Sequence, residues 1–220
     1  MADIKILYED GEALVIDKPS GMAVDRPRKG GICLEDHLER LKLGFQRAPV
    51  AVHRLDTDTS GCLLLARNPK ALARFNKAFE DRLVGKTYLA ILAGHPPGES
   101  GTIELSLSKI SSVEKGWRMI PAKKGKLAVS HWELVKDLGP NSLIRFRPET
   151  GRTHQLRVHA LAGLGAALLG DPVYGAGSAG AAKRTMLHAE SLTLIRPGKT
   201  TIEARAELPT DFNAFGAGDG

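Results

Sequence analysis

Four ionisable side chains fall within six positions of the segment VHRLDTDTSG, which runs from Val52 to Gly61. They are His53, Arg54, Asp56 and Asp58. The apolar run CLLLA follows directly, so the segment is drawn toward the interior or the floor of a cleft. A carboxylate held charged there could act as a nucleophile or a base. Because a partly buried carboxylate is unfavourable unless it is paired, a buried ion pair that only fixes the fold is the alternative.

Two further polar clusters lie beside apolar segments. One is Lys86 and Tyr88, in KTYLAILAG, and the other is TGRTHQLRVH, from Thr150 to His159. The second supplies Arg157, which together with Arg54 is an obvious partner for a buried carboxylate.

Several familiar motifs fail on their spacing or context. GAGSAG, at 175–180, has the glycine spacing of a dinucleotide-binding loop, but no clear strand precedes it. Two GKT tripeptides lack the first glycine of a phosphate-binding loop, and His154 and His159 lie five positions apart rather than four. No GxSxG elbow surrounds Ser60, although a hydrolase triad could be assembled from distant residues.

Read together, HRLDTDTSG and TGRTHQLRVH resemble the RluA family of RNA pseudouridine synthases. Four more segments resemble family motifs in the family's order: DKPSGMAV at 17–24, KTY at 86–88, GDPVYG at 170–175 and LHA at 187–189. Many relatives carry an accessory RNA-binding domain ahead of the catalytic one. Here the first motif begins within twenty residues of Met1, so no such domain is expected. Residues 96–126 contain no motif that can be placed.

The resemblance implies an isomerisation. The N1–C1′ glycosidic bond of a selected uridine breaks, the uracil turns while held, and C5 joins C1′, with no cofactor and no metal. By resemblance Asp56 is the catalytic carboxylate. Attack at C1′, attack at C6 and removal of a sugar proton all remain open. A single carboxylate suits the cleavage of a glycosidic bond, because positive charge develops at the anomeric carbon.

The same resemblance assigns roles to other residues. Tyr88 is the active-site tyrosine, whose ring can stack on the extruded uracil. Arg157 pairs with Asp56 and keeps it ionised. Arg54 fills the gap left by a flipped base. His53 and Thr59 are expected at the substrate, with His53 as a hydrogen-bonding group, as is His154; Thr59 also shapes the turn, with Ser60 and Gly61.

The elements that must position these residues are many strands and few helices, without regular βαβ alternation. The chain is therefore predicted to be an α+β protein, a single catalytic domain on a mostly antiparallel mixed sheet with a few flanking helices. The domain is expected to span 1–208, followed by a flexible tail at 209–220.

Individual segments give more local predictions. Residues 68–83 predict a helix capped by Asn68, with Leu72, Phe75, Phe79 and Leu83 as its core stripe. A short helix is expected at 33–41, a second helix at 152–164, and strands at 50–56 and 62–68. Cys62 is expected to be a buried free thiol.

Composition constrains the partners and the compartment. The chain has 220 residues and a net charge of +6, which fits an anionic partner such as nucleic acid, or simply solubility. Two cysteines without a CxxC favour a reducing compartment. The N-terminal segment lacks an apolar stretch of signal-peptide length, so no signal peptide is expected, and no segment approaches the ~20 apolar residues of a membrane helix. We expect a cytoplasmic monomer without membrane association.

The expected substrate is structured RNA, either transfer RNA or large-subunit ribosomal RNA, with the target uridine in a loop or flipped from a stem. Basic residues of the unassigned segment could meet phosphates or could form a solvated loop; they are Lys109, Lys115, Arg118, Lys123, Lys124 and Lys126. The rival functions are a non-catalytic RNA-binding protein on the same scaffold and a hydrolase that uses Ser60 or a carboxylate.

Overall fold

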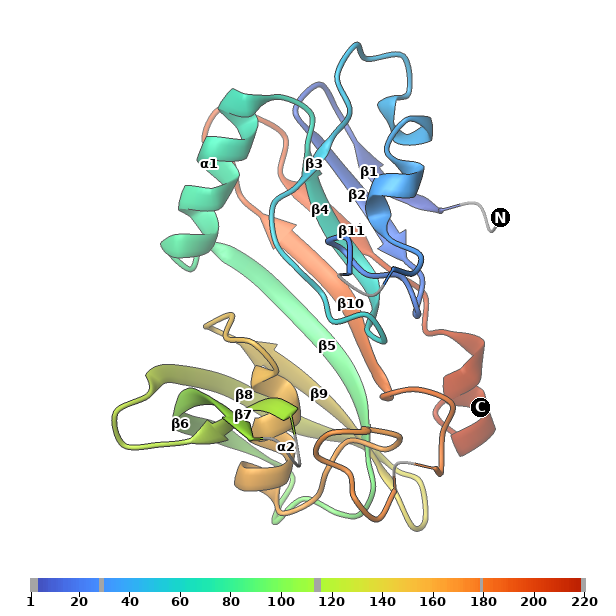
Figure 1. Cartoon of the computed structure of the whole chain (residues 1–220), viewed down its shortest axis with the longest axis vertical. Helices are drawn as coiled ribbons and strands as arrows, with labels where there is room; N and C mark the ends of the chain where they lie inside the picture. Colours follow the sequence, from blue (N-terminus) through green and yellow to red (C-terminus); the bar gives the residue numbers. More distant parts are fainter. Residues whose placement is uncertain (1–3, 28–29, 113–115, 179, 219–220) are drawn as a thin grey trace. The chain divides into compact units, whose positions relative to one another are not determined.

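Figure 1 shows the computed structural model of the chain, which describes residues 4–27, 30–112, 116–178 and 180–218. The residues form two compact units. The first unit contains the chain up to Lys86 and then His188–Glu207, and the second contains Thr87–Leu187 and the chain from Leu208 onward. The chain first passes from one unit into the other within strand β5, Val84–Leu92.

A sheet forms the centre of the first unit. Its strands are β1 (Ile6–Glu9), β2 (Ala13–Lys18), β3 (Val50–Ala51), β4 (Ser60–Ala66), β10 (Leu187–Leu194) and β11 (Ile202–Arg205). Antiparallel pairings join β1 to β2, β2 to β4, β3 to β4 and β10 to β11, whereas β4 and β10 run parallel. Both units mix strands with few helices, and their sheets are mostly antiparallel, which confirms the predicted α+β class.

Strand β4 is the most buried element of the first unit. All seven of its residues are buried, as expected of a continuous apolar run in a strand covered on both faces. Cys62 lies within it as a buried free thiol, as predicted, and burial raises its pKa to about 12. Gly61 has φ 106°, and a Cβ there would lie 2.2 Å from the carbonyl oxygen of Ala189. Only glycine fits this close approach of β4 to β10.

Helix α1 (Pro69–Glu80) confirms the helix predicted after Asn68, whose Oδ1 accepts the N–H of Ala71 at 2.8 Å. Phe75 is buried in the core, but the expected core position of Leu83 is wrong, because this residue is 64% exposed. The helix ends before it: Arg82 takes a left-handed φ of 59°, and the N–H of Leu83 turns back to the carbonyl of Ala78.

The second unit is built on antiparallel strands. In order across the sheet they are β5, β9 (Ser142–Pro148), β8 (Lys126–Asp137), β6 (Ser100–Ser112) and β7 (Gly116–Pro121). The unassigned segment 96–126 therefore forms most of a long β6–β7 hairpin at one edge of this sheet.

Helix α2 (Gln155–Leu164) packs on that sheet and confirms the helix predicted over 152–164. Its apolar residues Leu156, Ala160 and Leu164 share a core cluster with Phe146 of β9. A Cβ at Gly163 would lie 2.7 Å from the Ile103 side chain, so this glycine lets the helix approach β6 closely.

Three local predictions need correction. Residues 33–41 contain a 3₁₀ turn, η1 (Leu34–His37), and a second, η2 (Arg40–Lys42), begins at Arg40, because the chain closes i→i+3 hydrogen bonds there. Of the strand predicted at 50–56, only β3 forms. The predicted tail contains η3 (Thr210–Phe215), whose Phe212 is fully buried, whereas 219–220 lie outside the described residues.

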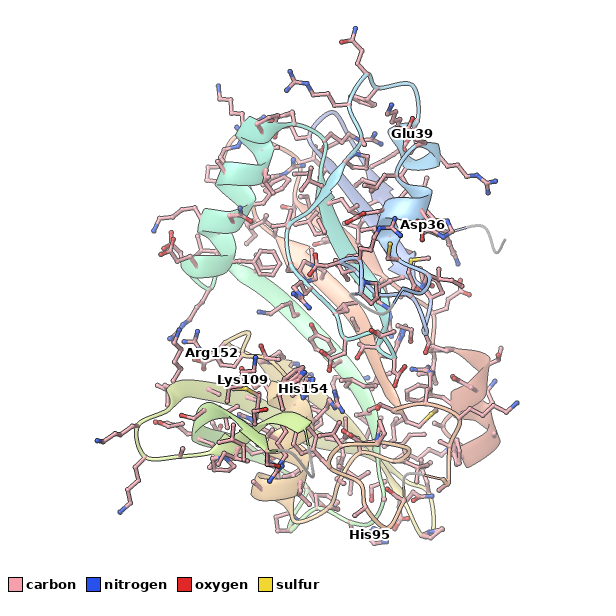
Figure 2. All side chains as sticks on the ribbon, viewed as in Figure 1. Asp36, Glu39, His95, Lys109, Arg152 and His154 are labelled. Atoms are coloured by element: carbon pink, nitrogen blue, oxygen red, sulfur yellow. The ribbon has the colours of Figure 1, made fainter. Side chains whose placement is uncertain are left out.

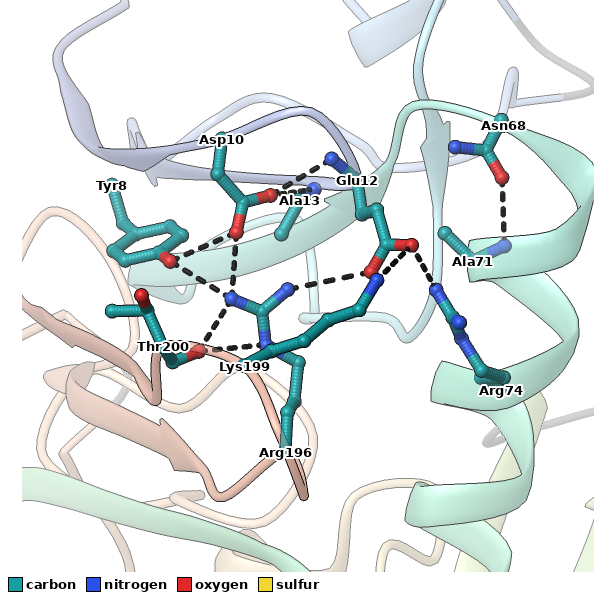
Figure 3. A network of polar contacts seen from close by, with 10 residues as sticks. All are labelled: Tyr8, Asp10, Glu12, Ala13, Asn68, Ala71, Arg74, Arg196, Lys199 and Thr200. Carbon is teal, nitrogen blue, oxygen red and sulfur yellow. Dashed lines mark hydrogen bonds and ion pairs between the residues drawn. The ribbon is translucent and has the colours of Figure 1, made fainter.

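A polar network joins the β1–β2 turn to helix α1 and to the loop after β10 (Figure 3). Nη2 of Arg196, in the loop after β10, donates to Oδ2 of Asp10 at 2.6 Å. Asp10, in the β1–β2 turn, accepts the N–H groups of Glu12 and Ala13. Glu12 in turn forms ion pairs with Lys199 and with Arg74 of α1. One turn is thereby tied to a helix and to a loop far along the chain.

This network predicts an acid-dependent part of the stability. Burial alone would raise the pKa of Asp10, but the hydrogen bonds from Arg196 and the two N–H groups outweigh it and lower the pKa to about 2. Because the unfolded value is about 4, the carboxylate stabilises the fold fully above about pH 4 and loses this effect as the pH falls to about 2.

The variant Asp10→Asn should therefore lower the free energy of unfolding at neutral pH by about 1–2 kcal/mol, measured by urea titration. The difference from the wild type should shrink on acidification. Glu99→Gln, the same loss of charge at an exposed residue, is the control. A difference that is independent of pH would show that the Asp10 charge is unimportant.

Candidate active site

Asp56 lies in a turn of the first unit, directly before β4. The N–H of Thr59 donates to the backbone carbonyl of Asp56 at 3.0 Å and closes the turn. Asp56 is half-buried, whereas Thr59 is buried. HRLD thus leads into a turn at 56–59, and the buried strand β4 that follows anchors this turn in the core.

A buried lysine donates a hydrogen bond to the backbone of this turn. Lys18, at the end of β2, is fully buried, and its Nζ donates to the carbonyls of Pro19 at 2.9 Å, Met22 at 2.8 Å and Thr57 at 3.1 Å. The N–H of Gly21 also donates to the Thr57 carbonyl, at 2.9 Å. The ammonium therefore fixes the backbone next to Asp56.

The rest of the DKPSG segment contributes in the same way. The hydroxyl of Ser20 donates to the carbonyl of Asp58 at 2.9 Å, and Gly21 takes a left-handed φ of 84°. The resemblance gave this segment no role, and the signal that could have revealed one is a lysine two positions after the apolar run ALVI. A buried ammonium needs several oxygen acceptors, and turn carbonyls supply them.

His53 and Arg54, next to Asp56, have very different surroundings. Nε2 of His53 accepts the N–H of Leu64 at 3.0 Å, and its ring stacks on Phe79 at 4.7 Å. Burial, with a smaller effect of Lys86, lowers the pKa of His53 to about 3, so the ring is neutral and acts as scaffold. Arg54 is 77% exposed and pairs with Asp25 at 2.7 Å, which leaves it accessible to a large ligand.

Ser60 does not present an accessible nucleophile. It is buried, and its Oγ lies 3.0 Å from Nδ1 of His188, which is also buried. His188 belongs to the LHA segment and pairs with Ser60 in the β4–β10 register. The pair joins two strands, and the hydrolase alternative based on Ser60 has no support.

The second unit holds Tyr88 and Arg157. Tyr88 lies in β5 opposite Phe146 of β9, is half-buried, and packs on the apolar cluster beneath α2. Arg157, in α2, is buried, and its Nε and Nη2 donate to Oδ2 and Oδ1 of Asp171 at 2.7 and 2.8 Å. This is a bidentate, fully desolvated ion pair.

Asp171 belongs to the GDPVYG segment and has more than one partner. Its Oδ1 also accepts the N–H groups of Val173 and Tyr174. Burial alone would raise the pKa of Asp171, but the hydrogen bonds and charge of Arg157 outweigh it and lower the pKa. The ring of Tyr174 lies 5.2 Å from the Arg157 guanidinium. GDPVYG is thus the support of Arg157, a role that the sequence analysis missed.

A family model described as RNA pseudouridylate synthase matches residues 12–162, which include the Asp56 turn, Tyr88 and Arg157. The chain belongs to this family. An uncharacterized RNA pseudouridine synthase of Zymomonas mobilis is 51% identical over 212 residues, which cover 96% of this chain and 97% of that protein. The enzyme is therefore a pseudouridine synthase of the RluA type, an isomerase that acts on RNA.

Other relatives agree with this family. Ribosomal large subunit pseudouridine synthase D of Zymomonas mobilis is 35% identical over 226 residues, which cover 95% of this chain and 70% of that protein. The solved structure of human RNA pseudouridylate synthase domain containing 4 has a TM-score of 0.78 and 26% identity, and covers 96% of this chain and 90% of that one.

The predicted site residues thus divide between the two units of the synthase. Asp56, Arg54, His53 and Thr59 belong to the first unit, and Tyr88 and Arg157 belong to the second. The pairing of Arg157 with Asp56 and the individual catalytic roles stay predictions. Within the described part of the chain, no group of three or more His, Cys, Asp or Glu residues could hold a metal ion, and no helix is long and apolar enough to cross a membrane.

The Lys18 ammonium and the carbonyls of Pro19, Met22 and Thr57 form the Lys18 cage. Removal of the ammonium should cause a large loss of stability. Lys18→Met leaves buried carbonyls without their donor, so the free energy of unfolding should fall by about 3 kcal/mol. Lys70→Met, on the exposed surface of α1, should change it by less than about 0.5 kcal/mol. Urea titration of both variants measures this. Equal effects would mean that the Lys18 ammonium does not hold the turn.

Substitutions at Arg157 and Asp171 should have non-additive effects on the free energy of unfolding. Arg157→Met leaves a buried carboxylate unpaired and should lower the free energy of unfolding by about 3–5 kcal/mol. Adding Asp171→Asn removes that charge, so the double variant should be more stable than Arg157→Met alone. A double-mutant cycle by denaturation decides this, and strict additivity would contradict a coupled pair.

Proposed function

We propose that the enzyme converts uridine to pseudouridine in structured RNA with Asp56 as the catalytic carboxylate, and that large-subunit ribosomal RNA is its substrate. The carboxylate proposal is supported most by the backbone around Asp56, which three elements hold in place: β4, the closing Thr59 N–H and the Lys18 cage. A reacting group needs such preorganisation. The ribosomal proposal rests on relatives named ribosomal large subunit pseudouridine synthases C and D; transfer RNA is the second candidate.

In the proposed reaction the N1–C1′ bond of uridine breaks, the uracil turns, and C5 bonds to C1′. The proton on C5 is lost and N1 gains one, so the reaction is an isomerisation. Asp56 either attacks C1′ or C6 or removes a sugar proton. In each case it acts as an ionised carboxylate next to the reacting sugar or base.

The other site residues would assist by binding and positioning. Tyr88, half-buried in β5, offers a ring for the extruded uracil. Arg54, exposed on the Asp56 turn, can enter the space left by a flipped base, while His53 and Thr59 support the turn. Arg157 would favour the ionised form of Asp56, but its pairing with Asp171 weakens its field at other sites.

We further propose that the enzyme acts as a monomer in the cytoplasm. Two buried, unpaired cysteines fit a reducing compartment, and the net charge of +6 fits an RNA partner.

The catalytic proposal predicts a separation of binding from turnover. Asp56→Asn is nearly isosteric, so the variant should fold and bind RNA but form no pseudouridine in a large-subunit ribosomal RNA transcript. Asp137→Asn, the same change at the exposed end of β8, should keep full activity. Product from purified Asp56→Asn above a no-enzyme control would refute the role of Asp56. Activity of the wild type on transfer RNA alone would refute the ribosomal substrate.

A further inference from the structure

An exposed indole marks the edge strand of the second unit. Trp117, the second residue of β7, is 46% exposed, whereas Trp132 is buried in the core. A large aromatic side chain with one face in the protein and the rest in water is typical of a binding surface. The family resemblance assigns no role to this hairpin.

The indole is held by an ordered set of side chains. It stacks on the ring of His154 with centroids 4.8 Å apart and an interplanar angle of 30°. Nδ1 of His154 lies 3.0 Å from the hydroxyl of Tyr174, which accepts the N–H of Met119 at 2.9 Å. His154 also has a left-handed φ of 52°, a conformation that is uncommon for a residue other than glycine.

One cation lies over the indole, and others lie elsewhere on the same unit. Nζ of Lys109 lies 5.0 Å from the ring centroid of Trp117, and in the β6–β7 register both residues point to the same face of the hairpin. Arg152 precedes His154 by two positions, and Figure 2 shows Lys109, Arg152 and His154 at the same end of this unit. Lys123, Lys124 and Lys126 are exposed in the turn after β7 and at the start of β8, and Lys115 lies outside the described residues.

A cavity of about 500 Å³ opens beside the same strand. Apolar residues of α2 and of the 172–174 turn form one wall, and residues 118–121 of β7 form the other. Nη1 of Arg118, which lines the cavity, is buried and has no hydrogen-bond partner in the described part of the chain. A buried donor of this kind is available to an acceptor from a ligand.

We propose that β7 binds an unpaired stretch of the RNA substrate, at nucleotides other than the uridine that reacts. One base stacks on Trp117, and Lys109 moves from the indole to a phosphate. An acceptor of the adjoining nucleotide enters the cavity and bonds to Arg118. A rigid aromatic plane with cations at its rim is how proteins bind single-stranded nucleic acid, whereas an acidic polypeptide would use the cations alone. The inference rests on the proposed RNA substrate.

Intrinsic fluorescence tests the stacking directly. Titration of the full chain with a short oligouridine should quench the emission of Trp117, and Trp117→Phe, which retains only the buried Trp132, should show no such quenching. RNA binding without any change in Trp117 emission would overturn the proposal. So would displacement of oligouridine by an equal charge of polyglutamate, since that ligand offers no base.

Affinity measurements separate aromatic stacking from apolar contact. Trp117→Leu should raise the Kd for oligouridine about tenfold, whereas Trp117→Phe should retain most of the affinity. Lys109→Gln, which removes the cation proposed to contact a phosphate, should lower the salt dependence of binding by about one counterion, and Arg118→Gln should raise the Kd. Phe45→Leu is the control, because Phe45 is similarly exposed, at 42%, and also lies under a cation, Arg67; its Kd should not change.

The pseudouridine assay distinguishes the two levels of failure. Suppose that the wild type forms pseudouridine in the ribosomal transcript and that Trp117→Leu has the Kd and KM of the wild type. The proposed RNA-binding platform on β7 is then wrong, and the proposed function stands. If the wild type neither binds nor modifies RNA, both fall. The platform is supported if KM rises in Trp117→Leu while kcat and thermal unfolding stay at the wild-type values.

Discussion

The first unit depends on one buried charge, the ammonium of Lys18. An ammonium away from water is tolerated only where oxygen atoms surround it, and here the oxygens are backbone carbonyls of two separate segments. One of them belongs to Thr57, the residue after Asp56. The requirement to solvate a lysine therefore also fixes the path of the backbone that carries the proposed catalytic carboxylate.

The second unit also contains a buried charge that polar groups stabilise, but this charge is negative. Asp171 is buried, and it is stabilised by two backbone N–H groups and the fork of Arg157. In each unit a segment that resembles a family motif, DKPSG or GDPVYG, supplies the polar partners of a segment for which a reactive role is proposed. The motifs therefore act in pairs. One motif contains the proposed site residue, and the other forms the hydrogen bonds that fix its position.

How far the sequence could predict this differs from residue to residue. Helix α1 was predictable because Asn68, Pro69 and the apolar spacing are local signals, and β4 because its run CLLLA is continuously apolar. The exposure of Leu83 was not predictable, since it depends on the left-handed turn at Arg82. The Asp171 partner of Arg157 and the burial of Ser60 against His188 were also out of reach, because local sequence patterns do not show which side chains meet across the fold. The full length of β6 and its pairing with β7 were not predictable, because exposed and polar residues interrupt the apolar alternation of both strands.

Both thiols of the synthase are buried. Their reactivity therefore reports local opening of the first unit. Cys33 is buried at the start of η1, and Cys62 lies in β4 between β2 and β10, with its pKa raised to about 12. A thiol reagent meets a reactive thiolate at Cys62 only after those strands separate. The modification rate of Cys62 would then measure how often the strand beneath the Asp56 turn opens, on a timescale set by the protein rather than by the reagent.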